Sequence, residues 1–239
     1  MKLDLLIFAA HPDDAELACS GTIAKLVAEG KKVGIVDLTR GELGSRGSAE
    51  LRDQEAADSS KIMGIHAREN LRFRDGFFAN DEAHKLAVAK KIRKFRPEIV
   101  IANAPFDRHP DHGRGSSLVR EAFFLSGLRR IETFGEDGQA QEAYRPKRIF
   151  YYIQDHHLEP SFVVDITPFY DIKLASIKAF TSQFFDPNSN EPKTYISSKD
   201  FWDFLEARAR HMGHLVGATF GEGFISDTPL KIDSPLDLI

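Results

Sequence analysis

A chain of 239 residues is long enough to bury one large α/β core without disulfides or a structural metal. Hydrophobic residues make up 42% of the chain and charged residues 28%, which is typical of a soluble globular protein rather than a disordered or membrane one. The formal net charge of -4 gives no general attraction to nucleic acid or anionic lipid, so we expect neither as a partner.

Cys19 is the single cysteine, which excludes an intramolecular disulfide and a cysteine-rich zinc site. We expect it to pack as a small apolar residue in the first helix. The N-terminus leads directly into a predicted strand without a signal peptide, and no apolar run reaches the length of a transmembrane helix. The cytoplasm is therefore the expected compartment.

Predicted strands and helices alternate along the chain. The pattern predicts strands at 3–9, 32–39, 70–73 and 98–102, and helices at 17–29, 49–63, 80–95 and 113–128. This order predicts a Rossmann-like, doubly wound and mostly parallel sheet with helices on both faces. Further elements follow as strands at 148–153 and 161–166, helices at 167–180 and 198–216, and a short closing element at 221–225. We expect residues 1–239 to form a single domain.

The loop after the first predicted strand concentrates groups that bind metals or move protons. Residues 10–16 read AHPDDAE and stand between an apolar strand and a helical segment. A pair of aspartates at this position can simply cap a helix, because carboxylates favour helix N-termini. A second loop of similar composition, RHPDH at 108–112, follows the predicted strand at 98–102 and argues against a mere cap.

Both loops are expected to face one crevice, because loops at the carboxyl ends of strands line the ligand crevice in open α/β sheets. A catalytic zinc takes three protein ligands and leaves one position to water or substrate. His11, Asp14 and His112 can supply that set, although the spacing alone is only moderately specific. The same ligands also suit Fe(II), Mn or Co(II), so the metal itself stays open at this point.

The two loops together resemble the paired signature of the LmbE-like (PIG-L) zinc-dependent N-deacetylases, and the similarity follows the chain order over nearly the full length. Four segments most resemble the bacillithiol-pathway enzymes that deacetylate N-acetylglucosaminyl malate: LTRGE at 38–42, LRDQE at 51–55, RAR at 208–210 and EGF at 222–224. One departure is Ala15, which separates Asp14 from Glu16 where many members run Asp-Asp-Glu. This departure leaves the ligand set intact.

The resemblance implies one zinc ion per chain, bound by His11, Asp14 and His112. It implies that Asp13 is the general base, which takes a proton from water whose pKa the metal has lowered. It further implies that His109 stabilises the oxyanion of the tetrahedral intermediate or passes a proton to the leaving amine.

Asp111 stands beside these groups and is placed to hydrogen-bond a histidine, keeping it charged or correctly oriented. The substrate that the resemblance implies is a small N-acetylated glycoside with an acidic aglycone.

Arg52 and Arg108 are the cationic side chains nearest the motifs, and arginine binds a carboxylate through two hydrogen bonds. We therefore expect one or both to bind the malate carboxylates or the sugar hydroxyls. Two alternatives stay open, namely an ion pair between Arg52 and Glu55 within one helix and a surface position for Arg108. Tyr195, in a late loop rich in Pro and Asn, is expected to cover the site or to pack against its edge.

A glycine-rich loop at 40–48 is either a mobile part of the crevice or an exposed connection. Its two arginines, Arg40 and Arg46, are weaker candidates for substrate binding. The resemblance also implies a homo-oligomer, with a hexamer as the expected form.

The leading hypothesis is zinc-dependent deacetylation of N-acetylglucosaminyl malate. One alternative is deacetylation of another N-acetylglucosamine conjugate, a diacetylchitobiose-like sugar or a mycothiol-type precursor. A second alternative is a non-catalytic metal-binding module, but a structural zinc would take four protein ligands. The loops instead offer three ligands, a spare carboxylate and a histidine suited to catalysis.

Overall fold

The computed structural model describes residues 1–238, and within this range seven strands and six α-helices make up the fold. The strands are β1 (Leu5–Ala9), β2 (Val33–Thr39), β3 (Ala67–Phe73), β4 (Ile99–Ala102), β5 (Arg148–Tyr152), β6 (Phe162–Asp165) and β7 (Gly221–Ser226). The α-helices are α1 (Asp14–Ala28), α2 (Ala49–Met63), α3 (Glu82–Phe95), α4 (Pro110–Ser126), α5 (Tyr170–Lys178) and α6 (Lys199–His214). Short 3-10 helices span Thr167–Phe169 and Pro235–Leu238.

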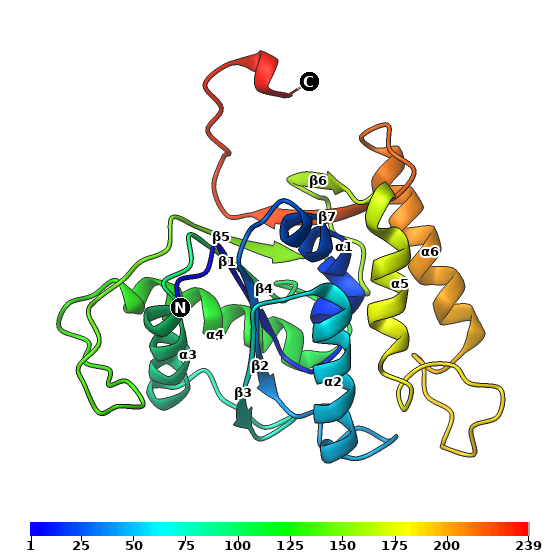
Figure 1. Cartoon of the computed structure of the whole chain (residues 1–239), viewed down its shortest axis with the longest axis horizontal. Helices are drawn as coiled ribbons and strands as arrows, with labels where there is room; N and C mark the ends of the chain where they lie inside the picture. The colour runs from blue at the N-terminus through cyan, green and yellow to red at the C-terminus, as the bar shows by residue number, and fades with distance from the viewer. Residues whose placement is uncertain (239) are drawn as a thin grey trace.

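The strands form one sheet in the order β3-β2-β1-β4-β5-β7-β6. Strands β1 to β5 run parallel to one another, whereas β7 is antiparallel to both β5 and β6. Helices cover both faces of the sheet (Figure 1). The predicted Rossmann-like, mostly parallel fold with extra C-terminal strands and helices is therefore confirmed.

Three details differ from the sequence-based expectation. The closing element at 221–225, expected to be irregular or strand-like and given no position in the sheet, is a full strand, β7, that inserts between β5 and β6. The helix expected at 167–180 is a 3-10 turn followed by α5. Helices α1 and α4 begin at Asp14 and Pro110, earlier than expected, because the His/Asp loops themselves form the first helical turns.

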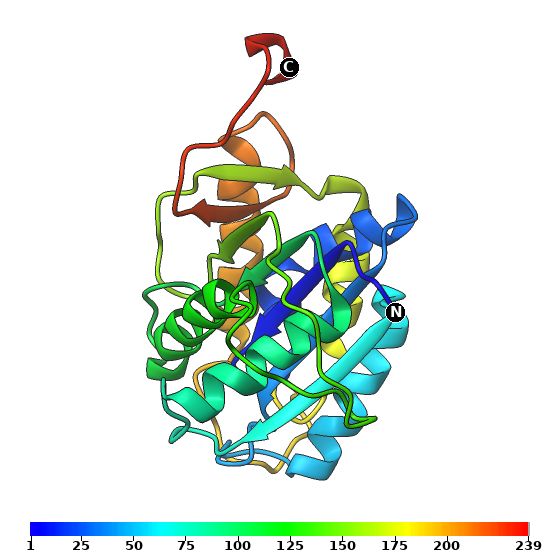
Figure 2. The same cartoon turned by 90° about the vertical axis from the view of Figure 1, so that its left-hand side faces the viewer.

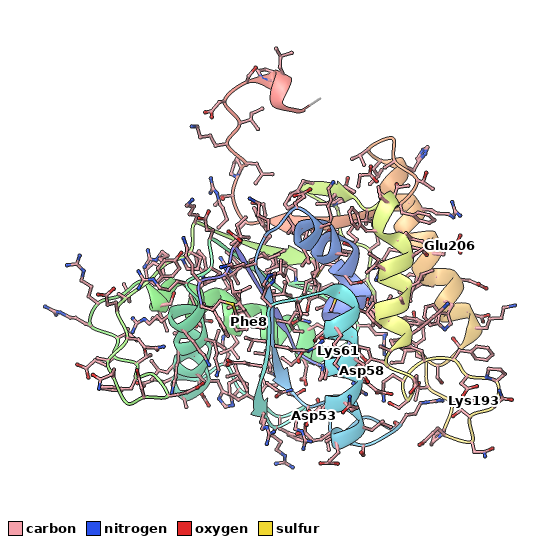
Figure 3. The ribbon with its side chains drawn as sticks, viewed as in Figure 1. Phe8, Asp53, Asp58, Lys61, Lys193 and Glu206 are labelled. Carbon is pink, nitrogen blue, oxygen red and sulfur yellow. The ribbon has the colours of Figure 1, made fainter. Side chains whose placement is uncertain are left out.

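Strand β1 is buried on both faces of the sheet, so it reads as a continuous apolar run. Leu5 and Ile7 pack on the side of α1 and α2, whereas Leu6 and Phe8 pack on the side of α3 and α4. Figure 3 shows Phe8 in the interior, with charged side chains such as Asp58 pointing outward from α2. The sheet is thus the middle layer between two helical layers.

Helix α5 packs outside α1 and α2, whereas α6 packs against β7 and β6 (Figure 1). Ile177 and Phe180, at and just after the end of α5, share an apolar cluster with Leu205 of α6 and Ala56 of α2. The segment after β7 extends away from the sheet, as the rotated view in Figure 2 shows. None of the helices within residues 1–238 combines the length and the apolarity needed to cross a bilayer.

Helix α1 is broken in its middle at Cys19, whose φ of -143° is not helical. The backbone N–H groups of Gly21 and Thr22, just after the break, donate to the carboxylate of Glu222 in β7 at 3.0 and 2.7 Å. Glu222 therefore acts as an N-cap for the second half of the helix. Cys19 itself is fully buried among apolar side chains, as predicted, and burial raises the pKa of its thiol.

Lys173 of α5 completes this arrangement on the other side of the break. Its ammonium group pairs with Glu222 at 2.7 Å and donates to the carbonyl oxygens of Glu16 and Leu17 at 3.2 and 3.0 Å. Both Lys173 and Glu222 are 3% exposed, so each charge depends on the other for its compensation. The C-terminal elements thereby fix the shape of the first helix.

We predict that Lys173→Met lowers the free energy of unfolding by about 3–5 kcal/mol, because the buried Glu222 carboxylate loses its cation. Denaturation by urea, followed by circular dichroism, measures this loss. The matched control is Lys147→Met, which removes the exposed pair with Glu98 and is expected to leave the unfolding midpoint unchanged. Equal, small shifts in both variants would contradict the structural role of the buried pair.

Candidate metal-dependent active site

The two His/Asp loops meet at the centre of the sheet. Strands β1 and β4 are hydrogen-bonded neighbours, and the chain continues from β1 toward β2 on one side and from β4 toward β5 on the other. This reversal of strand order is a topological switch point, where open α/β sheets place their ligand crevice. A cavity of about 390 Å³ opens there and is lined by residues of both loops.

The first loop turns sharply into α1 through a strained residue. Asp13 is the N-cap of α1 and has a φ of 125°, a backbone region that residues other than glycine rarely adopt. The backbone N–H of His11 donates to Asp14 Oδ2 at 3.0 Å, which tightens the turn. Strain of this kind persists only where the surrounding structure imposes it, and it is concentrated at functional sites.

The structure brings His11, Asp14 and His112 together, although the last two lie on different helices. Asp14 Oδ1 is 3.0 Å from His112 Nε2, and Asp14 Oδ2 is 3.5 Å from His11 Nδ1. His109 joins this group, because ring nitrogens of the three histidines lie within 4.8 Å of one another. His11, Asp14 and His112 are buried, whereas His109 is half-buried at the cavity wall.

Two carboxylates that the sequence analysis did not single out orient the histidines. Asp107 Oδ2 lies 2.5 Å from His112 Nδ1, and Asp75 Oδ1 lies 3.1 Å from His11 Nε2. A carboxylate on the second ring nitrogen fixes the tautomer and orientation of a metal-binding histidine. Asp107 stands just before the second motif, which was a usable signal, but Asp75 lies in a separate loop after β3 and carries no motif.

The histidine that the Asp111 carboxylate contacts is His11, in the first loop. Its Oδ2 is 3.4 Å from His11 Nε2 and accepts the backbone N–H of Gly76 at 2.9 Å. The ring of His109 faces Asp111 differently, because His109 Nδ1 accepts the backbone N–H of Asp111 at 3.3 Å. The carboxylate of Asp111 is thus directed at His11 of the first loop and not at His109 of its own loop.

The charges of the site shift the ionisation of its histidines strongly. Burial opposes a charge on His11, but hydrogen bonds with Asp111, Asp14 and Asp75 raise its pKa well above the usual value. Burial likewise opposes a charge on His112, but Asp14 and Asp107 raise the pKa of His112 to about 9. Burial also opposes ionisation of Asp14, yet the two histidines hold its pKa well below the usual range.

This donor set fits a divalent cation. The carboxylates draw protons onto His11 and His112, so that protons supply the positive charge that the cluster requires. A metal ion would displace those protons, because nitrogen ligands bind metals in their neutral form. Nitrogen and carboxylate ligands in this number suit Zn²⁺ and several other divalent metals.

Arg52 lies against the carboxylate expected to act as the base. Its Nη1 is 3.4 Å from Asp13 Oδ2 and donates to the carbonyl oxygen of Pro12 at 3.2 Å. The alternative pair with Glu55 is not formed, since Glu55 accepts hydrogen bonds from the 181–182 segment instead. Burial raises the pKa of Asp13 to about 7, against the opposing charge of Arg52.

Arg108 and Tyr195 lie together at the cavity wall. Arg108 Nε is 3.5 Å from Asp155 Oδ2, and the Tyr195 hydroxyl donates to Asp155 Oδ1 at 2.8 Å. The Arg108 guanidinium carbon lies 4.5 Å from the centre of the Tyr195 ring, a cation–π distance. Both side chains remain about half exposed, at 46% and 48%, so they can reach a ligand in the cavity.

His109 faces the same cavity with its ring 4.6 Å from the ring of His11. Burial, together with the charges of His11 and His112, lowers its pKa below the usual value. Arg208 of α6 also lines the cavity and donates to the carbonyl oxygens of Leu17, at 2.6 Å, and of Gln154. Only the family resemblance of the RAR segment pointed to Arg208, because a helix far along the chain gives no local signal.

The two arginines of the glycine-rich loop have structural partners. Arg40 pairs with Asp53 at 2.7 Å on the outer side of α2 and is not among the residues lining the cavity. Arg46 is buried and donates to the carbonyl oxygens of Ser182 and Pro192 at 2.7 and 3.1 Å. It therefore holds the late Pro/Asn loop against the rest of the cavity wall.

Comparison with known proteins identifies the family. A family model described as GlcNAc-PI de-N-acetylase (PIG-L) matches residues 6–123, a range that includes both His/Asp loops. The crystal structure of the conserved protein TT1542 from Thermus thermophilus is 39% identical, with a TM-score of 0.86 and coverage of 98% of both chains. The chain belongs to the PIG-L (LmbE-like) family of N-deacetylases.

Two further PIG-L relatives have a named substrate. The diacetylchitobiose deacetylase of Thermococcus kodakarensis is 27% identical over 237 residues, covering 92% of this chain and 81% of that protein. The structure of the N,N'-diacetylchitobiose deacetylase from Pyrococcus horikoshii is 28% identical, with a TM-score of 0.79 and coverage of 98% and 88%. These comparisons confirm the predicted family, fold and class of enzyme.

We predict that Arg46→Ala exposes the Pro/Asn loop of this PIG-L protein to proteolysis. Each hydrogen bond from a charged donor contributes about 1.5–3 kcal/mol, so cleavage within residues 183–193 should become at least about tenfold faster. Limited proteolysis with mass spectrometry of the fragments measures this rate. Arg40→Ala is the control, and cleavage that is equally fast in both variants would contradict the anchoring role.

Proposed function

We propose that this PIG-L protein hydrolyses the N-acetyl group of N-acetylglucosaminyl malate, giving glucosaminyl malate and acetate in bacillithiol biosynthesis. The observation that carries this proposal is the placement of Arg108 at the wall of the cavity that contains the His/Asp cluster. A cationic, half-exposed guanidinium favours an acidic aglycone, because it binds carboxylate groups through two parallel hydrogen bonds.

His11, Asp14 and His112 are the residues that would hold one zinc ion per chain. When bound, the metal would supply a positive charge that polarises the amide carbonyl and acidifies water. Asp107 and Asp75 orient the two histidines for this task through their second ring nitrogens. Fe(II), Mn or Co(II) would be held by the same atoms.

Asp13 is the proposed general base, which accepts a proton on its carboxylate as water attacks the amide. It lines the cavity directly beside Asp14, and its strained backbone directs it away from an ordinary capping role. A base is most effective when its pKa lies near the working pH, and burial places the pKa of Asp13 at about 7. Arg52 Nη1 lies 3.4 Å from Asp13 Oδ2 and keeps this carboxylate in position.

His109 is proposed to stabilise the negative charge that develops on the oxygen of the amide carbonyl. It lines the cavity beside the two ligand histidines, from where its ring can donate to the oxyanion or pass a proton to the leaving amine. Asp111 contributes indirectly, because its carboxylate contacts His11 and thereby positions a ligand. Tyr195 covers the cavity edge and, with Arg108, is proposed to contact the aglycone.

The second candidate is deacetylation of a chitooligosaccharide or of another N-acetylglucosamine conjugate. It is favoured by the two relatives named as diacetylchitobiose deacetylases. A non-catalytic metal-binding module fits less well, because a cavity of about 390 Å³ borders the cluster and a structural zinc is enclosed by four ligands. A homo-oligomer, expected as a hexamer, a cytoplasmic location and a single domain over residues 1–239 stay predictions.

We predict that Asp13→Asn strongly lowers turnover without removing the metal. The turnover number should fall about 100- to 10,000-fold, since proton transfer by a positioned base contributes that much. Acetate release from N-acetylglucosaminyl malate and metal content are measured on the same samples. Metal-replete wild-type enzyme that cleaves neither this substrate nor diacetylchitobiose would overturn the proposed substrates, while a fully active variant would overturn the role of Asp13.

We predict that replacing Arg108 and replacing Arg52 affect the two substrates differently. Arg108→Ala should lower kcat/KM about 10- to 100-fold for the malyl glycoside and much less for N-acetylglucosamine, because it removes a charged contact to the aglycone alone. Arg52→Ala should lower the rate on both substrates, since Arg52 supports Asp13. Equal losses on both substrates in Arg108→Ala would show that this residue does not read the malate group.

A further inference from the structure

Two buried amide side chains stand behind the proposed ligand Asp14. We infer that Asn103 and Gln154, here called the amide clamp, position the carboxylate of Asp14 and the ring of His112 for metal binding. Neither amide belongs to the two sequence motifs, and they follow the ends of β4 and β5 respectively. The inference rests on the proposed ligand role of Asp14, which the experiment below tests separately.

The backbone determines which way the Asn103 amide points. Its Oδ1 accepts the backbone N–H of Ala10 at 2.9 Å, and a backbone N–H can only donate. The amino group of Asn103 must therefore face the opposite side, where Nδ2 donates to Asp14 Oδ2 at 3.0 Å and to Gln154 Oε1 at 3.1 Å. One fully buried side chain thus joins the end of β1, the ligand carboxylate and the end of β5.

The same reasoning determines the orientation of Gln154. Its Oε1 accepts the backbone N–H of Ala104 at 3.2 Å, so its amino group must point toward the metal-binding groups. Nε2 donates to Asp14 Oδ1 at 3.1 Å and lies 3.3 Å from His112 Nε2. The two amides together bind both oxygens of the Asp14 carboxylate and prevent it from rotating.

The clamp also acts on the proposed histidine ligand of the second loop. Asp107 Oδ2 lies 2.5 Å from His112 Nδ1, which directs the Nδ1 proton toward that carboxylate and leaves Nε2 to face the cluster. The Gln154 amino group borders this atom, so it bounds the space that His112 can occupy. Gln154 therefore contacts one ligand from each loop.

Neutral donors matter at Asp14 because they leave the negative charge of its carboxylate available to a metal cation. The nearby buried carboxylates pair with cations, namely Asp13 with Arg52, Glu16 with Arg68 and Glu222 with Lys173. Asp14 instead accepts hydrogen bonds from two neutral amides, and its cationic partners are the two protonated histidines, whose protons a metal ion would displace. An amide holds the carboxylate without cancelling its charge, so the full charge is kept for a metal cation.

The test compares metal affinity in Gln154→Met, Asp14→Asn and a control. Methionine preserves the length of the glutamine side chain but removes the hydrogen bond to Asp14 Oδ1 and the polar contact with His112 Nε2. Gln141→Met makes the same change at a glutamine remote from the cavity, which donates to the Lys90 carbonyl. Zn²⁺ affinity is measured by competition with a chelating dye, and the visible spectrum of the Co²⁺ form reports ligand geometry.

We expect Gln154→Met to weaken Zn²⁺ binding about 10- to 100-fold and to change the Co²⁺ spectrum, since residues that orient metal ligands contribute this much to affinity. Gln141→Met should leave both unchanged. Gln154→Asn, which keeps the amide but withdraws it by one methylene, should show the same direction of change if the methionine variant does not fold.

The test distinguishes a wrong ligand set from a wrong role of the amide clamp. If Asp14→Asn binds Zn²⁺ as tightly as the wild type, the ligand set of the proposed function is wrong. If Asp14→Asn loses Zn²⁺ while Gln154→Met and Gln154→Asn retain wild-type affinity and spectrum, the ligand set stands and the amide clamp is overturned. A melting temperature of the metal-free protein that falls without any change in affinity also overturns it, because that outcome describes a purely structural role.

Discussion

The parallel pairing of β1 with β4 is the constraint on which the site depends. These strands lie far apart in the sequence, yet their pairing places His11 and His112 at one edge of the sheet. A one-residue shift in the register of β1 would move Leu6 and Phe8 into the layer where Leu5 and Ile7 pack, and it would also misplace the first loop. The apolar core and the geometry of the polar cluster are therefore specified together.

The concentration of buried charge beyond these strand ends is the second constraint. Each buried carboxylate needs a compensating partner, and the fold supplies an arginine at Asp13 and two histidines with two amides at Asp14. Burial raises the pKa of Asp13 against the charge of Arg52, whereas the two histidines hold the pKa of Asp14 well below its usual range despite burial. Two adjacent aspartates can thus take different chemical roles because their surroundings differ.

Local sequence patterns predicted the elements and the two His/Asp loops well, because apolar periodicity and loop composition are local signals. They could not predict that β7 inserts between β5 and β6, since strand order depends on packing rather than on spacing. They also missed Asp75, Asn103 and Gln154, which carry no motif and reach the site only through the fold. The ion-pair partner of Arg52 could not be predicted for the same reason.

The C-terminal third is required for the site that the N-terminal half encodes. The PIG-L family model matches residues 6–123, which contain both His/Asp loops, but Tyr195 and Arg208 of the cavity wall lie outside that range. Helix α1, which begins at Asp14, is broken in its middle and stabilised there by Lys173 and Glu222. The proposed ligand that opens this helix therefore depends on elements more than a hundred residues away. The C-terminal elements thus support the first helix and part of the cavity wall, whereas the proposed proton chemistry belongs to the two loops.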